Sequence, residues 1–226
     1  MSKINICTPV IGNNLEVFLR NLKETQKFSN FVELRTDYIL DLKKVNLKLL
    51  KNKTKIKSIF TCRSKFEGGL FNKTEENRID ILINASKVGF HLIDVELSTL
   101  RNNNFLHKLN KKTKYIISYH NFKRTPNKKQ LLNIINGMAK YSPFIIKITT
   151  MVNSKRDAQT LLYLNLNKSF KEKRIIIGMG KKGIVTRILA PFFGSYLTYS
   201  SPLSSKTATG QLDFETLNSI YNYKNK

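Results

Sequence analysis

A chain of 226 residues with 41% hydrophobic side chains is long enough to form one well-packed core, so we expect a single domain spanning residues 1–226. No stretch approaches the roughly 18 uncharged apolar residues of a membrane-spanning helix, and we expect no association with a membrane. Lys and Arg number 40 and Asp and Glu 15, so the formal net charge is +25, which raises nucleic-acid binding as a hypothesis.

The distribution of charge argues against a nucleic-acid-binding surface. Lysines are spread over nearly every segment between the apolar runs, for example 51–57 and 171–174, and no basic tail or RNA-binding aromatic motif accompanies them. A coding bias toward Lys, Asn and Ile would produce the same composition. We therefore expect no specific nucleic-acid partner, and a basic nucleic-acid-binding protein is the non-enzymatic alternative.

The first residues and the cysteines bear on the cellular compartment. The segment Met1-Ser-Lys-Ile-Asn-Ile leads directly into an apolar run and lacks the apolar core and cleavage site of a signal peptide. Cys7 and Cys62 fall in predicted strands without metal-ligand spacing, and we expect them to be reduced. These features predict a cytoplasmic protein.

Short apolar runs alternate with longer amphipathic segments along the chain. The runs predict strands at Ile4–Thr8, Phe31–Thr36, Ser58–Cys62, His91–Glu96, Tyr115–Tyr119, Phe144–Thr149, Arg174–Met179 and Ser195–Tyr199. Apolar residues at helical spacing predict helices between them, at Leu15, Phe18 and Leu22, at Ile79, Leu82 and Ile83, and at Leu131, Ile135 and Met138. Phe214, Leu217, Ile220 and Tyr221 predict a final helix after the last strand.

Strands that alternate with helices predict an α/β fold with a parallel sheet, and eight such units in a single domain predict a (β/α)8 TIM barrel. A doubly wound open sheet is the main alternative. It is disfavoured because no Gly-x-Gly-x-x-Gly follows the first strand. The similar segment Gly178-Met-Gly180-Lys-Lys-Gly183 follows the seventh strand, where barrels often bind anions.

One predicted strand contains a lysine, Lys147, within the run Phe144–Thr149. Lysine is rarely buried without a partner, because its charge resists leaving water. A desolvated lysine can act as an amine nucleophile that forms a Schiff base with a carbonyl. The alternative is a strand-end lysine that reaches solvent or pairs with a carboxylate.

Polar side chains follow most of the predicted strands, at the ends that converge on the active site of a barrel. They lie in Glu33-Leu-Arg35-Thr-Asp37, Thr61-Cys-Arg63, Glu67-Gly-Gly69, Asp94-Val-Glu96, Ser118-Tyr-His120, Lys147, Thr186-Arg187 and Lys206–Gln211. Each has a structural alternative, such as an ion pair for Glu33 and Arg35. Together, arginines, a histidine and a lysine around one cavity predict a site for an anionic, oxygen-rich substrate with a reactive carbonyl.

These motifs, in this order, resemble those of the type I 3-dehydroquinate dehydratases, the Schiff-base class of the shikimate pathway, and they cover nearly the whole chain. The resemblance implies a hydro-lyase that converts 3-dehydroquinate to 3-dehydroshikimate and water by syn elimination. It thereby implies a role in chorismate and aromatic amino-acid biosynthesis. It further implies a homodimer and no metal or organic cofactor, and the sequence has no metal-ligand cluster.

The resemblance also assigns roles to individual residues. Lys147 would form the imine with the substrate ketone, and His120 would act as general base and then general acid. Glu67 would position groups or carry protons, and Arg187 would hold the substrate carboxylate. The other substrate-binding residues implied are Cys7, Glu33, Leu34, Arg35, Arg63, Thr207 and Gln211.

The chain departs from the family pattern at four positions. Cys7, Thr186 and Thr207 stand where the family usually has serines, and Thr209 replaces a proline in the same loop as Thr207. A class I Schiff-base aldolase on the same barrel is the enzymatic alternative, because Gly180-Lys-Lys-Gly183 would suit a phosphate group. An absorbance assay for the conjugated enone product would separate the two activities.

Overall fold

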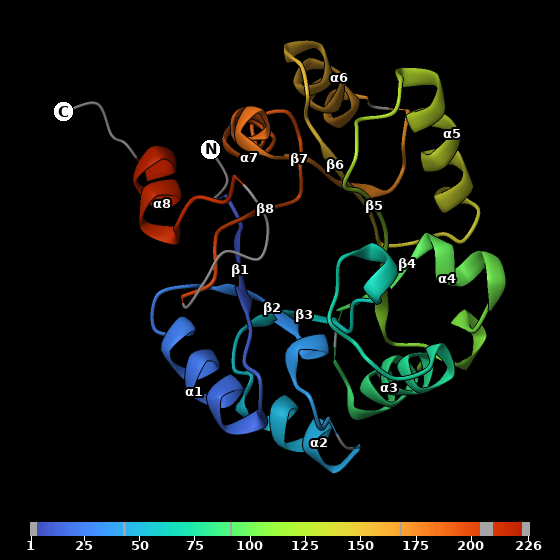
Figure 1. The fold of residues 1–226 in the computed structure, drawn as a ribbon, viewed down its shortest axis with the longest axis vertical. Helices are drawn as coiled ribbons and strands as arrows, with labels where there is room; N and C mark the ends of the chain where they lie inside the picture. The colour runs from blue at the N-terminus through green and yellow to red at the C-terminus, as the bar shows by residue number, and fades with distance from the viewer. Residues whose placement is uncertain (1–3, 43, 91, 168, 204–209, 223–226) are drawn as a thin grey trace. The chain divides into compact units, whose positions relative to one another are not determined.

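The computed structural model describes residues 4–42, 44–90, 92–167, 169–203 and 210–222 (Figure 1). The strands are β1 (Ile6–Val10), β2 (Phe31–Arg35), β3 (Lys57–Thr61), β4 (Leu92–Glu96), β5 (Lys114–Asn121), β6 (Ile145–Met151), β7 (Lys173–Met179) and β8 (Thr198–Tyr199). The α-helices are α1 (Leu15–Thr25), α2 (Lys44–Lys53), α3 (Glu75–Val88), α4 (Leu97–Asn102), α5 (Lys128–Ala139), α6 (Lys155–Leu166), α7 (Ile184–Leu189) and α8 (Phe214–Asn222).

The strands belong to one eight-stranded sheet, in the order β7-β6-β5-β4-β3-β2-β1-β8. The pairs β1–β8, β2–β3, β3–β4 and β6–β7 are parallel. The chain divides into two compact units, residues 8–116 and residues 1–7 together with 117–226, so that β1 and β5 each contribute residues to both. The two units are described in turn.

In residues 8–116, local sequence signals explain where the helices begin and end. Asn14 caps α1 through its side chain, which accepts a hydrogen bond of 2.9 Å from the backbone N–H of Val17. Thr74 caps α3 in the same way, and α3 ends at Gly89, whose φ of +94° suits glycine. The helices cover a core in which Phe60 and Phe90 pack with ring centroids 4.8 Å apart.

In residues 1–7 and 117–226, helices α5 and α6 pack against β6 and β7 (Figure 1). Both helices begin with a capping box, formed by Asn127 with Gln130 and by Ser154 with Asp157. Strands β6 and β7 are paired along their full length, and Lys147 lies opposite Ile175. The Tyr221 hydroxyl anchors α8 by donating to the carbonyl oxygens of Arg187 and Ile188, at 3.0 and 2.9 Å.

The predicted strands agree with the structure within a few residues, except the last. The prediction was Ser195–Tyr199, whereas β8 contains only Thr198–Tyr199. The backbone N–H of Ser195 closes a turn to the carbonyl of Ala190 at 2.9 Å, and that of Tyr196 donates to Arg174 at 2.7 Å. Those donors are therefore used outside the β1–β8 pairing. The helices predicted from the four apolar patterns are confirmed as α1, α3, α5 and α8.

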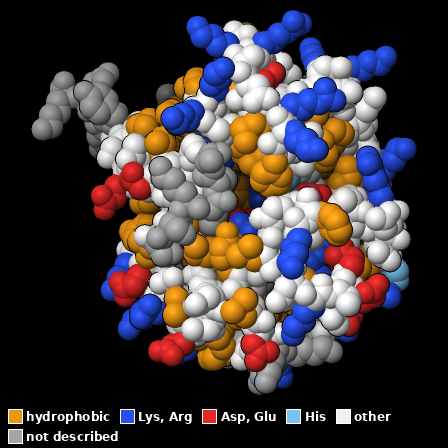
Figure 2. All heavy atoms as spheres, in the orientation of Figure 1, with side chains coloured by type: hydrophobic (Ala, Val, Ile, Leu, Met, Phe, Trp, Pro, Cys, Tyr) orange, Lys and Arg blue, Asp and Glu red, His pale blue; other side chains and the backbone are white. Residues whose placement is uncertain are grey.

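One face of the molecule shows how its positive charge is distributed. On the face shown in Figure 2, Lys and Arg side chains are scattered, with hydrophobic and uncharged side chains between them. The expectation of no specific nucleic-acid partner stays a prediction. Within the described ranges, no helix has the length and apolar character needed to cross a membrane.

Candidate active site

At the end of β2, Arg35 forms a bidentate ion pair with Asp37. Its Nε and Nη2 donate to Asp37 Oδ1 and Oδ2 at 2.9 and 2.8 Å, and its guanidinium lies 4.9 Å from the ring centroid of Tyr38. Glu33 accepts a hydrogen bond of 3.0 Å from Thr61 Oγ1. Leu34 is fully buried, and strand alternation places its side chain on the opposite face from Glu33 and Arg35.

At the ends of β3 and β4, Arg63 lies between two carboxylates. Its Nη2 is 2.9 Å from Asp94 Oδ1, and its Nη1 is 3.2 Å from Glu96 Oε1. Burial would lower the pKa of the guanidinium, but Asp94 and Glu96 together raise it above its ordinary value. The second oxygen of Glu96 is 2.6 Å from Nη1 of Arg78, a fully buried arginine on α3. This network holds Arg63 in one orientation.

Glu67 lies in the short 3-10 helix η2 (Lys65–Glu67) that follows β3. It is 8% exposed and accepts a hydrogen bond of 2.7 Å from Ser98 Oγ. Burial raises the pKa of Glu67, and Arg63 opposes that rise. Gly69 lets this turn approach Arg63, because a Cβ at Gly69 would lie 2.1 Å from the Arg63 carbonyl oxygen. A carboxyl with a raised pKa is suited to the proton-carrying role expected of Glu67.

In the other unit, Lys147 lies in β6 and is only 4% exposed. Its Nζ is 4.7 Å from the ring centroid of Tyr199 in β8, a distance typical of a cation–π contact. The structure therefore places the strand lysine in a buried position, as its sequence context predicted. Tyr199 lies opposite Cys7 in the β1–β8 register, and the Cys7 side chain is fully buried.

His120 lies near the end of β5 and is partly exposed. Its ring stacks with that of Phe122, with a centroid distance of 6.3 Å and an interplanar angle of 19°. Because β5 precedes β6 in the chain and the strands are neighbours in the sheet order, His120 and Lys147 lie on consecutive strands of this unit.

Arg187 lies on α7 and is 2% exposed. Within the described part of the chain it makes no ion pair, and its Nε has no hydrogen-bond partner. Burial lowers the pKa of Arg187 to about 10, while Tyr199 opposes the shift, so the side chain is still charged at neutral pH. An arginine that is buried, charged and not paired with a carboxylate differs from Arg35 and Arg63 and is available to an anion.

Gln211 is buried, and its Nε2 donates to the Ser200 carbonyl at 3.3 Å. It follows Gly210, whose φ is +81° and where a Cβ would lie 2.4 Å from the Gly180 carbonyl oxygen, so this close approach requires glycine. Thr207 lies outside the described residues, as does Thr209.

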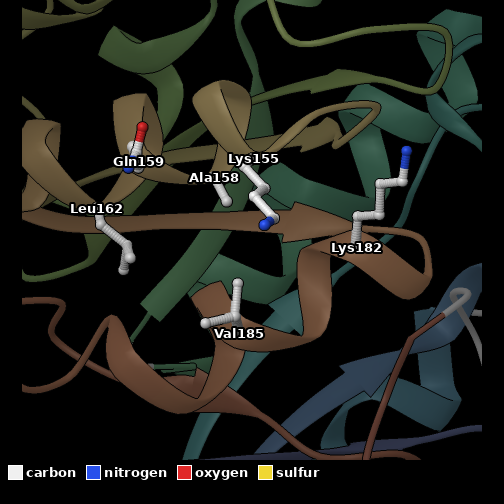
Figure 3. A pocket seen from close by; sticks show the side chains of 6 residues that line it. All are labelled: Lys155, Ala158, Gln159, Leu162, Lys182 and Val185. Atoms are coloured by element: carbon white, nitrogen blue, oxygen red, sulfur yellow. The ribbon is translucent and has the colours of Figure 1, made fainter.

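A pocket of about 330 Å³ lies between α6 and α7 (Figure 3). It is lined by Lys155, Ala158, Gln159, Leu162, Lys182 and Val185. None of the predicted site residues is among them, and Lys182 Nζ donates to the Asn153 carbonyl at 2.8 Å. The pocket is therefore distinct from the strand-end residues. No group of three or more potential metal ligands occurs within the ranges that the structure describes.

Sequence reasoning missed several partners of the predicted residues. Glu96 was among the strand-end residues but was given no role, and Arg78 was not predicted, although both belong to the ion-pair network that orients Arg63. Tyr199 was not predicted to lie beside Lys147. Asp94 and Glu96 lie two residues apart in β4 and therefore share one strand face, and this spacing could have indicated that both contact the same partner. No local pattern could have indicated Tyr199, because it is 52 residues from Lys147.

The model of the family described as type I 3-dehydroquinase matches residues 6–226. A 3-dehydroquinate dehydratase of Coxiella burnetii (strain CbuK_Q154) is 38% identical over 216 residues, which cover 96% of this chain and 91% of that protein. A 3-dehydroquinate dehydratase of Methanococcus maripaludis is 38% identical over 218 residues, covering 95% and 97%.

The crystal structure of 3-dehydroquinate dehydratase from Geobacillus kaustophilus HTA426 matches with a TM-score of 0.89 and 25% identity, covering 97% of this chain and 90% of that one. This similarity and the parallel strand order confirm the predicted (β/α)8 barrel. The family match extends over nearly all of the sequence and agrees with the predicted resemblance. The chain therefore belongs to the type I 3-dehydroquinase family.

Proposed function

We propose that Lys147 is the imine-forming nucleophile of this enzyme, which is a type I 3-dehydroquinate dehydratase, a hydro-lyase of the shikimate pathway. The observation that carries the proposal is the burial of the Lys147 amine in β6, 4.7 Å from the ring centroid of Tyr199. A lysine amine in a buried site can act as a nucleophile that attacks a carbonyl. The family match also favours dehydration over the aldolase alternative.

The reaction follows from the electron demand of the elimination. The Lys147 amine adds to the substrate ketone, and the carbinolamine takes up a proton and loses water to give a protonated imine. His120 then removes the proton α to the imine carbon, which leaves an enamine. The enamine expels the β-hydroxyl group, which takes a proton from His120, and the bond order shifts to a conjugated imine. Hydrolysis of that imine releases 3-dehydroshikimate and restores the free lysine.

The arginines would divide the work of substrate recognition. Arg187 would bind the substrate carboxylate, because it is buried and carries no carboxylate partner of its own. Arg35 and Arg63 are already neutralised by Asp37 and by Asp94 with Glu96, so they would present their remaining donors to hydroxyl groups. Glu33, Leu34, Cys7, Thr207 and Gln211 complete the proposed binding residues, with Leu34 contributing through its backbone.

Replacing Arg187 with methionine is expected to raise KM for 3-dehydroquinate by about 100-fold, since a charge-assisted pair to the carboxylate is lost. Arg174→Met is the matched control, because Arg174 lies near the start of β7 and is not among the proposed binding residues. Steady-state kinetics at neutral pH measure both. An Arg187→Met enzyme with the wild-type KM would show that another group binds the carboxylate.

Borohydride reduction during turnover tests the nucleophile directly. Wild-type protein treated with 3-dehydroquinate and borohydride is expected to gain one covalent adduct, located at Lys147 by peptide mass spectrometry, because reduction makes the imine permanent. Lys147→Ala protein treated in the same way is expected to gain none. An active enzyme whose Lys147 stays unmodified would rule out the Schiff-base assignment.

Three further proposals concern the oligomeric state, the cellular location and the domain organisation of the protein. The family resemblance favours a homodimer, which light scattering after size-exclusion chromatography would measure. Cys7 and Cys62 are buried and form no disulfide within the described residues, and we propose a reducing, cytoplasmic location. We also propose that residues 1–226 act as one catalytic domain, because the family model matches residues 6–226 without interruption.

A further inference from the structure

Thr149 carries a buried hydroxyl group whose role the proposed reaction does not explain. It lies in β6 two residues after Lys147 and is 6% exposed. Its Oγ1 has no hydrogen-bond partner among the described residues. Buried hydroxyl groups are nearly always hydrogen-bonded in folded proteins, because an unpaired one loses its contacts with water and gains nothing in return. The described part of the chain therefore leaves the Thr149 hydroxyl group able to bond to another group.

The strand geometry directs Thr149 toward the same side as the nucleophile. Side chains two residues apart in a strand lie on one face, so Thr149 and Lys147 share a face of β6. Lys147 extends from that face toward the Tyr199 ring in β8. Thr149 thus follows Lys147 on the same strand face, toward the C-terminal end of the strand, where barrel enzymes bind their substrates.

The neighbouring Thr150 shows what an ordinary buried threonine does at this point of the strand. It faces the other side of β6, where its Oγ1 is 2.9 Å from Thr125 Oγ1. Thr125 in turn donates to the Met151 carbonyl at 2.8 Å. The face toward the helices therefore satisfies its hydroxyl groups within the protein, whereas the face that carries Lys147 leaves one without a partner.

Arg187, in the same unit, also has a buried polar atom, Nε, that lacks a hydrogen-bond partner among the described residues. We propose that Thr149 is a further substrate-contacting residue, whose Oγ1 hydrogen-bonds an oxygen of the bound substrate next to the carbon that Lys147 attacks. A hydroxyl group can donate to the ketone or carbinolamine oxygen and can accept from a ring hydroxyl. Thr149 would therefore contribute hydrogen bonds only and would transfer no proton in the reaction. This inference rests on the proposed function of Lys147.

Valine substitutions at Thr149 and at Thr150 test the inference, because we expect opposite effects on the melting temperature and on KM. Thr149→Val removes a hydroxyl group that has no partner among the described residues, so the melting temperature is expected to stay the same or rise, while KM rises about tenfold. Thr150→Val breaks an internal hydrogen bond, so the melting temperature is expected to fall by about 2–4 °C with KM unchanged. Thr149→Ser keeps the hydroxyl group and is expected to restore the wild-type KM.

Steady-state kinetics, thermal unfolding and borohydride trapping with 3-dehydroquinate separate the possible outcomes. A Thr149→Val enzyme with wild-type KM and kcat, still trapped at Lys147, would overturn the inference and leave the proposed function standing. A KM that is raised in both Thr149→Val and Thr149→Ser would show a steric effect instead of a lost hydrogen bond, and it would also overturn the inference. Absence of an adduct in the active wild-type enzyme would instead overturn the proposed function.

Discussion

Lys147→Ala is expected to reduce kcat by about 10⁴-fold or more, the scale seen when a covalent nucleophile is removed. Without the amine, the ketone cannot be converted to an imine, and the α-proton loses the electron sink that makes it acidic. Lys147→Arg is expected to be equally inactive, because the guanidinium keeps the charge but is not a nucleophile. Absorbance of the enone product measures the loss.

The control for Lys147 must separate chemistry from stability. Lys173 is suitable because it also lies over aromatic rings, with Nζ 4.8 and 4.6 Å from the ring centroids of Phe144 and Tyr196, but it is exposed at the start of β7. Lys173→Ala is expected to retain the wild-type kcat. Residual activity of the Lys147→Ala enzyme above about one tenth of wild type would contradict the role of Lys147 as nucleophile.

His120→Ala is expected to lower kcat by about 10²–10⁴-fold, the usual contribution of a positioned general acid–base group. Imine formation needs only the lysine and the ketone, so the first covalent step is expected to persist. Elimination and imine hydrolysis both need proton transfer, and they are expected to slow. Borohydride trapping should consequently capture more adduct at Lys147 in this variant than in the wild type at steady state.

His107 provides the matched control, since it is exposed in the short 3-10 helix η3 (Leu106–Lys108) and belongs to no proposed site. His107→Ala is expected to leave kcat and trapping unchanged. A His120→Ala enzyme that turns over at nearly the wild-type rate would assign the acid–base role elsewhere. A variant that forms no adduct at all would show that His120 is needed before elimination.

Much of the fold followed from sequence patterns because its strands are short apolar runs and its helices carry apolar residues at helical spacing. The exception, β8, shows where such patterns fail. Ser195 and Tyr196 are compatible with a strand, but the N–H of Ser195 closes a turn to Ala190 and the N–H of Tyr196 donates to Arg174 in β7. The positions of those two carbonyl groups, which the local sequence pattern does not indicate, decided the length of the strand.

The candidate site was predictable in its residue types and less so in its pairings. The sequence indicated an ion pair between Glu33 and Arg35 as a structural alternative, but it did not indicate that Arg35 pairs with Asp37 or that Glu33 accepts from Thr61. Alternation along a strand indicates which side chains share a face, but it does not indicate which of several carboxylates an arginine will reach. Thr149 illustrates the same limit: alternation places Thr149 and Thr150 on opposite faces of the strand, but only the structure shows that the Thr150 hydroxyl has a partner and that the Thr149 hydroxyl has none among the described residues.

The sequence by itself determined the class of fold, the family and the strand that carries Lys147, because these depend on local periodicity and on motifs in a definite order. The tertiary structure alone decided that Lys147 is buried beside Tyr199, that Asp94 and Glu96 neutralise Arg63, and that Arg187 is buried without a carboxylate. The physical reason is that burial and charge pairing depend on contacts between residues far apart in the chain, which local patterns do not encode.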